Sequence, residues 1–536
     1  MPYYIVVGGN TLYRMNTAGT ATALTLPTDV TIDTARRPRM AVLGKNVILT
    51  NATSRSVFVD PNGATVRLAQ LKAPTSAPVL TSAETGLLTG TFRVKYTHII
   101  KDTETGALLV ESPFSPISAS SGSITLKLLK AAIETSPDPG VTHRRLYRTA
   151  TGPGATYYPW IDVEGNTITT VSDDLLDASL SLVAAPTELG AVAGAAFLTY
   201  MTLLVEWKGR LWGVGNVDVD KLRYTGTDLL YAWKTSYEIV IPPVGNDSFG
   251  ITGLIPRRDE LGVCRRNLMW SIRGDTPTTF ERKKVHDGKG CVAPESVVVI
   301  EDIGYFLGAD GVYTWGPDGV NCISNGKVRK WFTTTTYFNR ARFENAFARY
   351  NAKYHGYELY LSNTGDTTWN RWVFYDIERG RWWGPHLTGA AFTATSALGN
   401  FIDADNLIVP IIGATDDKIY TGNNATLLDA STAISVSATS ARHSEGTPDI
   451  KKLFGGPSII FAEQAAAGNL SVACKVGAVD EGTTRTLTVD QTKPGRERFS
   501  PLGEGEHCQL VFTESTGSQA CQLLGYEIPV HELGRR

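Results

Sequence analysis

Apolar and polar residues alternate along most of the chain, and clusters of Gly, Asn, Asp and Ser separate the alternating runs. Alternation with a period of two places apolar side chains on one face of an extended strand, while the clusters supply turns. Residues 90–97 (GTFRVKYT) are a clean example. The pattern predicts an all-β protein made of many short strands.

Patterns typical of amphipathic helices are few. Residues 126–134 (LKLLKAAIE) carry the best one, and residues 338–348 (FNRARFENAFA) carry the second. Both space apolar residues three or four positions apart, as one face of a helix requires. We expect these two segments to be helical and the rest of the chain to consist of strands and turns.

One loose motif recurs along the chain: an apolar strand, a turn with Gly or Asn, and a second strand that carries Trp or Tyr near its end. Residues 303–315 (IGYFLGADGVYTW) form the clearest copy. From Trp207 onward the copies return about every 40–60 residues, the length of a four-stranded propeller blade. Blades stacked around an axis bury sheet faces that one sheet cannot bury alone. The motif predicts a degenerate β-propeller of about six to eight blades, with a series of unrelated hairpins as the alternative.

Two stretches interrupt the repeat. A Pro-, Ser- and Thr-rich segment at 73–78 opens a run of short strands over about 110 residues, which is typical of a sandwich resembling fibronectin type III domains. After residue 425 aromatic residues thin out while the alternation continues. The predicted parts are 1–75, N-terminal propeller strands; 76–186, an inserted fibronectin-III-like β-sandwich; 187–425, the main propeller blades; and 426–536, a C-terminal β-sandwich or closing blade.

The charge balance is close to neutral. The 536 residues include 51 Lys and Arg against 53 Asp and Glu, and charged residues make up 19% of the chain, below the roughly 25% of ordinary soluble proteins. Such a composition excludes coiled coils and highly charged disordered chains. Basic clusters such as residues 36–39 (RRPR) are dispersed among acids, so they do not form a conventional nucleic-acid patch. In a ring of subunits, one such cluster per subunit would form a positive collar.

No segment predicts secretion or a membrane span. The first residues lack the basic and apolar regions of a signal peptide, and the longest weakly charged run, residues 191–205, is short for a span. Six cysteines without a CxxC pair indicate free thiols in a protein made in a reducing cytosol. Cys508 and Cys521 lie on neighbouring predicted strands, and the sequence leaves open whether they are bonded.

Signatures of catalysis and of ligand binding are missing from the sequence. It contains no GxSxG elbow, HExxH pair or Walker loop, and its eight histidines lack ligand spacing. The pairs Asp173-Asp174 and Asp416-Asp417 lie in turn sequences, where Asp caps its own backbone. Residues 308–313 (GADGVY) lack the residue order of a sialidase Asp box. We therefore expect no catalytic, cofactor or metal site, and no enzymatic activity.

Tryptophans beside basic residues are the candidate site. They occur in residues 330–332 (KWF), 369–372 (WNRW) and 381–385 (RWWGP). Arg over Trp is a favourable cation–π pair, and both residue types are enriched at protein interfaces. Packing in a blade core and stacking on carbohydrate are the alternatives. The candidate interface residues are Trp331, Trp369, Trp372, Arg381, Trp382 and Trp383.

The order of these parts resembles the nozzle or hub proteins of short-tailed bacteriophages, also called tail tubular or tail stabilisation proteins. The resemblance covers nearly the whole chain and includes residues 145–149 (RLYRT) before Ile161-Asp162, then residues 210–213 (RLWG) and 381–383 (RWW). It implies a virion tail protein that is synthesised in the host cytoplasm and forms a hexameric ring. The implied partners are portal or adaptor proteins, tail fibres, and double-stranded DNA that passes through during ejection without sequence-specific binding.

A second class of function stays open. The chain also fits a β-propeller carbohydrate-binding or glycan-degrading receptor-recognition protein. A glycosidase propeller brings carboxylates from several blades to one opening, and the sequence alone does not place its acids in space.

Overall fold

The computed structural model describes most of the chain, and strands dominate it. The described residues are 3–28, 30–33, 37–50, 55–60, 65–82, 84–102, 105–152, 154–180, 183–185, 201–215, 217–231, 233–234, 236–243, 249–388, 394–402, 407–416, 418–421, 428–429, 432–433, 436–440, 443–444, 451–461, 468–476, 484–489, 496–498, 503–514 and 523–533. Their helices are short: α2 (Arg329–Thr333) and the 3-10 turns η1 (Asp177–Ser179), η2 (Pro294–Ser296) and η3 (Arg340–Asn345). The all-β prediction is confirmed. Within the described residues, no helix is long and apolar enough to cross a membrane.

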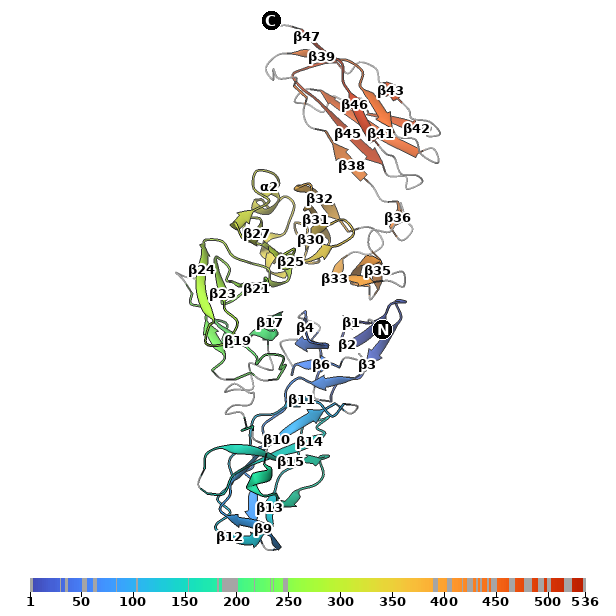
Figure 1. Ribbon diagram of the computed structural model, residues 1–536. Helices are drawn as coiled ribbons and strands as arrows, with labels where there is room; N and C mark the ends of the chain where they lie inside the picture. Colours follow the sequence, from blue (N-terminus) through green and yellow to red (C-terminus); the bar gives the residue numbers. More distant parts are fainter. Residues whose placement is uncertain are drawn as a thin grey trace. The chain divides into compact units, whose positions relative to one another are not determined.

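Seven sheets of the described residues surround a common centre (Figure 1). We call them blades 1 to 7. Blade 1 contains β1 (Tyr3–Gly8), β2 (Thr11–Asn16) and β3 (Ala21–Leu24), and blade 2 contains β4 (Arg39–Leu43), β5 (Asn46–Thr50), β6 (Val57–Val59) and β7 (Val66–Leu68). Blade 3 contains β17 (Met201–Trp207), β18 (Arg210–Gly215), β19 (Lys221–Tyr224) and β20 (Glu238–Val240). Blade 4 contains β21 (Gly253–Pro256), β22 (Leu261–Cys264), β23 (Leu268–Arg273) and β24 (Glu281–Asp287).

The remaining blades follow the same meander. Blade 5 contains β25 (Val298–Ile300), β26 (Ile303–Leu307), β27 (Val312–Gly316) and β28 (Gly319–Cys322). Blade 6 contains β29 (Phe347–Asn351), β30 (Gly356–Leu361), β31 (Arg371–Asp376) and β32 (Arg381–Leu387), and blade 7 contains β33 (Thr395–Ile402), β34 (Ile408–Ala414) and β35 (Ile419–Thr421). Seven blades fall within the predicted range, so the propeller prediction is confirmed.

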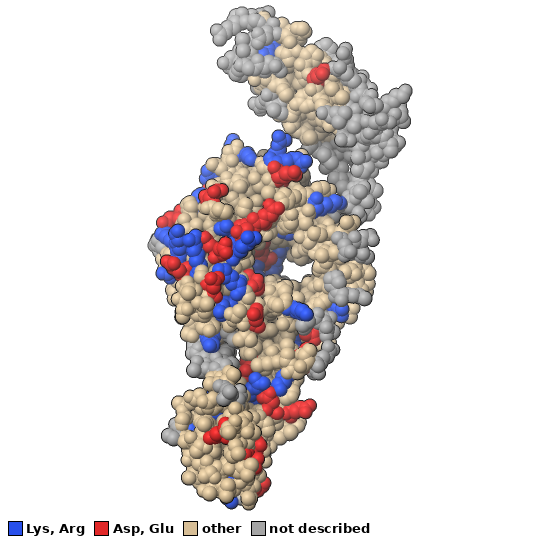
Figure 2. Space-filling model, viewed as in Figure 1, with Lys and Arg blue, Asp and Glu red and all other residues tan. Residues whose placement is uncertain are grey.

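The ring closes between blades 7 and 1 through side-chain contacts. The Tyr4 hydroxyl accepts a hydrogen bond from the backbone N–H of Ile402 at 2.7 Å, and the rings of Tyr4 and Phe401 lie 5.0 Å apart. Blade 6 is tied to blade 7 by Arg349, which donates to the carbonyl of Ile411 at 2.7 Å. A hollow is visible at the centre of the ring in Figure 2. Basic and acidic side chains are interspersed on the side of blades 4 and 5, so no large surface of one charge forms there.

A fibronectin-III-like β-sandwich is inserted between blades 2 and 3. Its strands are β8 (Val79–Thr81), β9 (Thr85–Gly90), β10 (Val94–Lys101), β11 (Leu108–Glu111), β12 (Ile124–Lys127), β13 (Leu129–Ala132), β14 (His143–Thr149), β15 (Tyr157–Glu164) and β16 (Thr170–Asp173). They form the sheets β11-β10-β14-β15, β16-β13-β8 and β12-β9. The core between the sheets contains Phe92, Tyr96, Leu146 and Trp160, all buried.

The helix expected at residues 126–134 is wrong. This segment forms β12 and β13, in which Leu129 and Ala131 are fully buried while Lys130 and Ala132 face outward. Burial against the sandwich core favours a period of two and overrides the helical propensity of Leu, Lys and Ala. The second expected helix, residues 338–348, is present only as the 3-10 turn η3.

The sandwich is packed against the propeller. Ile100 and Val110 belong to the same buried cluster as Leu43 of blade 2 and Met201 of blade 3. At this junction the Asp138 carboxylate has no exposed surface, and it accepts hydrogen bonds from the Arg55 guanidinium at 2.7 and 3.0 Å. Because a buried carboxylate needs such partners, this ion pair holds the two parts in a defined arrangement.

The last part of the chain forms a separate β-sandwich. Contacts divide the chain into two compact units: Met1–His386 with Ser396–Gly413 and Asp417–Tyr420, and Leu387–Thr395 with Ala414–Asp416 and Thr421–Arg536. The strands of the second unit are β36 (Leu428–Asp429), β37 (Thr432–Ala433), β38 (Val436–Thr439), β39 (Lys452–Phe454), β40 (Ser458–Phe461), β41 (Gly468–Val476), β42 (Thr484–Val489), β43 (Arg496–Arg498), β44 (Gly503–Gly505), β45 (Cys508–Glu514), β46 (Leu523–Glu527) and β47 (Val530–Glu532). Phe454, Val472 and Leu510 lie in its core. The four-part division predicted from the sequence stays a prediction.

Candidate functional site

The six candidate interface residues all lie on or beside blade 6. Trp372 is on β31, and Arg381, Trp382 and Trp383 are on its outer strand β32. Trp369 precedes β31 in the turn from β30, and Trp331 is in α2. The structure therefore gathers residues from three separate sequence segments around one blade.

Three of these tryptophans pack within the propeller. The Trp382 Nε1 donates to the carbonyl of Ile323 at 3.1 Å, and its ring lies 5.0 Å from that of Tyr375. Trp372 stacks on Tyr360 with ring centroids 6.0 Å apart. Trp331 is half-buried and packs beside Tyr337. These contacts account for the three residues as packing partners.

Trp383 and Arg381 are the exposed members of the set. The Trp383 side chain is 53% exposed, and Arg381 is exposed beside it on β32. An exposed Trp on an outer strand provides a large apolar surface at little cost in conformational entropy. These two residues stay the candidates for contact with a partner.

Trp369 takes part in a contact that links blades across the ring. The Arg37 guanidinium, from the connection between blades 1 and 2, lies 3.5 Å from the Phe347 ring centroid and 4.4 Å from that of Trp369. Arg37 also forms an ion pair with Glu295 at 3.3 Å, and Arg39 pairs with the same carboxylate at 2.9 Å. Glu295 precedes blade 5 in η2, so blades 2, 5 and 6 are joined at this point.

A cavity of about 400 Å³ adjoins this ion-pair cluster at the inner strands of blades 2 to 5. We call it the axial cavity. Most of its lining residues have apolar side chains, among them Met40, Leu203, Leu254 and Val299. Among the described lining residues Glu295 is the only acid, and both of its oxygens are engaged by arginines. Glu295 is therefore the partner of two ion pairs at the edge of the cavity.

The Arg37 guanidinium loses contacts with water because it is largely buried. Burial lowers the pKa of Arg37, although the ion pair with Glu295 opposes the shift. Two aromatic faces and one carboxylate replace the water that the guanidinium loses, which is a favourable setting for Arg. Sequence reasoning noted the RRPR cluster but not its partners, because Phe347, Trp369 and Glu295 are more than 250 residues away in the chain.

We expect Arg37→Ala to lower the free energy of unfolding by about 1–3 kcal/mol, because one substitution removes two cation–π contacts and an ion pair. Arg381→Ala is the matched control. Since Arg381 is exposed, its replacement should change the free energy of unfolding by no more than about 0.5 kcal/mol. Urea denaturation of both variants measures the difference, and equal stabilities would contradict the role assigned to Arg37.

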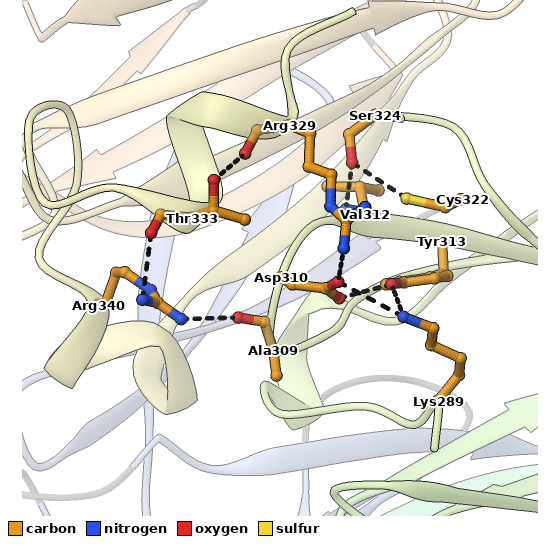
Figure 3. Close-up of polar contacts among 10 residues, drawn as sticks. All are labelled: Lys289, Ala309, Asp310, Val312, Tyr313, Cys322, Ser324, Arg329, Thr333 and Arg340. Carbon is orange, nitrogen blue, oxygen red and sulfur yellow. Dashed lines mark hydrogen bonds and ion pairs between the residues drawn. The ribbon is translucent and has the colours of Figure 1, made fainter. Parts of the chain in front are cut away.

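A second polar cluster connects the turns of blade 5 (Figure 3). Asp310, between β26 and β27, accepts hydrogen bonds from the Tyr313 hydroxyl and the Arg329 guanidinium, each at 2.5 Å. Lys289 donates to the Tyr313 hydroxyl at 2.7 Å. Burial works against ionisation of Asp310, but these hydrogen bonds outweigh it and lower its pKa. The carboxylate is fully engaged, so the cluster is suited to fixing turns rather than to transferring protons.

The buried cysteines among the described residues lack the environment of reactive thiols. Cys264 and Cys291 are buried, and burial raises the pKa of both, that of Cys291 to about 12. Cys508 is also free, and Cys521, whose bonding to Cys508 the sequence leaves open, lies outside the described residues. No group of His, Cys, Asp and Glu suited to holding a metal ion occurs among the residues that the structure describes.

Comparison with known proteins provides no family. No protein-family model matches the chain, and no curated protein matches it. Among solved structures it is similar to PorZ, a bacterial surface component of the type-IX secretion system of Porphyromonas gingivalis, with a TM-score of 0.27, 11% identity, and coverage of 99% of this chain and 80% of that one. It is also similar to an exo-β-1,3-galactanase from Phanerochaete chrysosporium, with a TM-score of 0.19, 7% identity, and coverage of 98% and 100%. At these TM-scores neither likeness supports a conclusion about this chain.

Proposed function

We propose that this chain is a non-enzymatic structural protein, the nozzle or hub subunit of a short bacteriophage tail, present as a hexameric ring in the virion. The proposal combines the order of sequence parts with one structural observation: the only acid among the described residues of the axial cavity is neutralised by two arginines. The propeller, the inserted sandwich and the C-terminal sandwich then serve as a scaffold that attaches adaptor and fibre proteins.

The neutralised acid favours a scaffold over a glycosidase. Glycoside hydrolysis commonly needs two carboxyl groups about 5–10 Å apart, one of them able to give up a proton. Both carboxylate oxygens of Glu295 are engaged by Arg37 and Arg39, and the other described residues around the cavity are apolar or basic. This arrangement supports a structural role for the centre of the propeller rather than a catalytic one.

The near-neutral charge supports a conduit for DNA. Tight, counterion-releasing contacts with phosphates would retard a moving duplex. With a net charge of −2 and mixed charges over blades 4 and 5, the chain has no broad basic surface in that view. Under this proposal the isolated protein binds duplex DNA weakly, at about 10⁻⁵ M or worse near physiological salt.

A carbohydrate-binding protein is the second candidate, and the exposed Trp383 favours it. Sugar rings stack on exposed indoles, and Trp383 stands on an outer strand where a glycan has access. In the nozzle or hub proposal, the same indole contacts a neighbouring subunit of the ring. A subunit contact and a glycan-stacking role therefore predict opposite results for the substitution Trp383→Ala.

Trp383→Ala separates the two candidates. If Trp383 anchors a subunit interface, the substitution should weaken assembly by about 2 kcal/mol, roughly 30-fold in association, with no change in glycan binding. Tyr354→Ala, which removes another aromatic side chain that is 53% exposed, is the matched control. Native mass spectrometry of assemblies and a glycan array measure both properties. Specific glycan binding that Trp383→Ala abolishes, with assembly intact, would replace the structural proposal with the carbohydrate one.

A further inference from the structure

The outer edge of blade 1 is an open strand edge. Five blades have four strands, whereas blade 1 ends at its third, β3, which pairs with β2 alone. No described residue pairs with the other edge of β3. The position occupied by a fourth strand in blades 2 to 6 is therefore not filled by any strand of the described chain.

This edge lacks the devices that protect other outer strands. On β24, Arg282, Lys283 and Lys284 are exposed, and β32 contains Pro385. Charges and proline on edge strands oppose pairing with another chain. By contrast, residues 15–28 (MNTAGTATALTLPT) contain no charge at all, and Ala21, Thr22 and Ala23 are exposed. The edge of β3 is suited to accept another strand.

The hairpin register shows which backbone groups face outward. The N–H of Asn16 donates to the carbonyl of Thr20 at 3.1 Å, which makes these two residues a hydrogen-bonded pair. In an antiparallel ladder such pairs alternate with non-bonded ones. Thr22 is then bonded to its partner Arg14 on β2, and Ala21 and Ala23 direct their N–H and C=O groups away from β2.

We propose that two copies of this chain pair antiparallel through β3, about a twofold axis at Thr22, to form one continuous six-stranded sheet. In that register Ala21 faces Ala23 of the partner subunit, and the outward groups of both strands form four backbone hydrogen bonds. Thr22 faces Thr22 of the partner subunit at a non-bonded position, where Thr–Thr pairs are favourable.

We expect the strand that pairs with β3 to come from a second copy of this chain, because the edge of β3 is complementary to itself. The strand is uncharged, so a twofold arrangement places no like charges opposite each other. An isologous contact of this kind closes after two subunits and buries both edges at once. The inference goes beyond the proposed function, since a purely sixfold ring contains no such axis. The pairing belongs to the free protein before it joins a tail.

The first test removes one outward donor. Ala23→Pro deletes an N–H that β2 does not use, and proline is tolerated on edge strands. Ala23→Ser keeps that N–H and is the matched control. In sedimentation velocity of the full chain, we expect dimers for the wild type and for Ala23→Ser, and at least tenfold weaker dimerisation for Ala23→Pro with an unchanged circular dichroism spectrum. Dimers of equal strength in all three proteins would overturn the proposal.

The second test fixes the register. Thr22→Cys places two thiols opposite each other at a cross-strand position where Cβ atoms are about 4.5–5.5 Å apart, so mild oxidation should give a covalent dimer in high yield. Ala18→Cys, exposed in the adjoining turn, should not cross-link. Equal cross-linking of both variants, or a monomeric wild type, would contradict the pairing. A monomeric free protein that still forms rings in virions would leave the proposed function intact.

Discussion

Replacing Trp212 with alanine is expected to lower the free energy of unfolding of the propeller by about 3–5 kcal/mol. Trp212 has no exposed surface, and its ring packs against Tyr224 at 4.6 Å and Phe280 at 5.0 Å. Its Nε1 donates to the carbonyl of Trp207 at 3.1 Å. The substitution leaves a large cavity that blade 3 and its neighbour cannot refill.

Trp383→Ala is the control for this experiment. Both substitutions remove an indole from a propeller strand, but Trp383 is 53% exposed, so the expected change is within about 0.5 kcal/mol. Urea unfolding followed by near-ultraviolet circular dichroism compares the two variants. A Trp212 variant as stable as the wild type would mean that blades 3 and 4 do not pack as described.

Asp138→Ala should cost about 3–5 kcal/mol at pH 7, the usual price of removing one partner from a buried ion pair. The substitution leaves the Arg55 guanidinium without its carboxylate at the junction between sandwich and propeller. The backbone N–H of Lys72, which donates to Asp138 at 2.5 Å, loses its acceptor in the same variant, so its hydrogen exchange should become faster. Unchanged exchange and stability would contradict the role of this pair.

The contribution of Asp138 should also depend on pH. Burial alone would raise its pKa, but hydrogen bonds from Arg55 and from the Lys72 backbone outweigh burial and lower the pKa. A carboxyl group whose pKa is lowered by folding stabilises the folded state above its unfolded pKa of about 3.9 and loses that contribution as pH falls through the folded value. The stability difference between wild type and Asp138→Ala should therefore be constant near neutral pH and shrink below about pH 4.

Local patterns in the sequence were sufficient for the fold class and for the propeller. The alternation in residues 303–315 corresponds to β26 and β27, because strand periodicity and turn residues act over a few positions. The helix prediction for residues 126–134 was wrong because their pattern suits a helix locally. Only burial of Leu129 and Ala131 against distant strands selects the extended form. Periodicity does not contain that information.

The candidate site was predictable only in part. The sequence places Trp369 near Arg371, yet its cation–π partner is Arg37, from the connection between blades 1 and 2. Arg257, next to β21 of blade 4, likewise lies over Trp315 on β27 of blade 5. In the adjacent pairs Arg371-Trp372 on β31 and Arg381-Trp382 on β32, neighbouring side chains point to opposite faces of the strand, so each arginine is poorly placed to cover its tryptophan. Contacts between blades depend on closure of the ring, which a single sequence does not encode in any local pattern.

The central claim is that this chain is a ring-forming structural subunit. Imaging of the intact assembly by electron microscopy, combined with its mass by native mass spectrometry, tests it most directly. We expect a sixfold ring of six copies in the assembled particle. A stable monomer or trimer at the native site, or an assembled form that releases sugars from a glycan substrate, would contradict it.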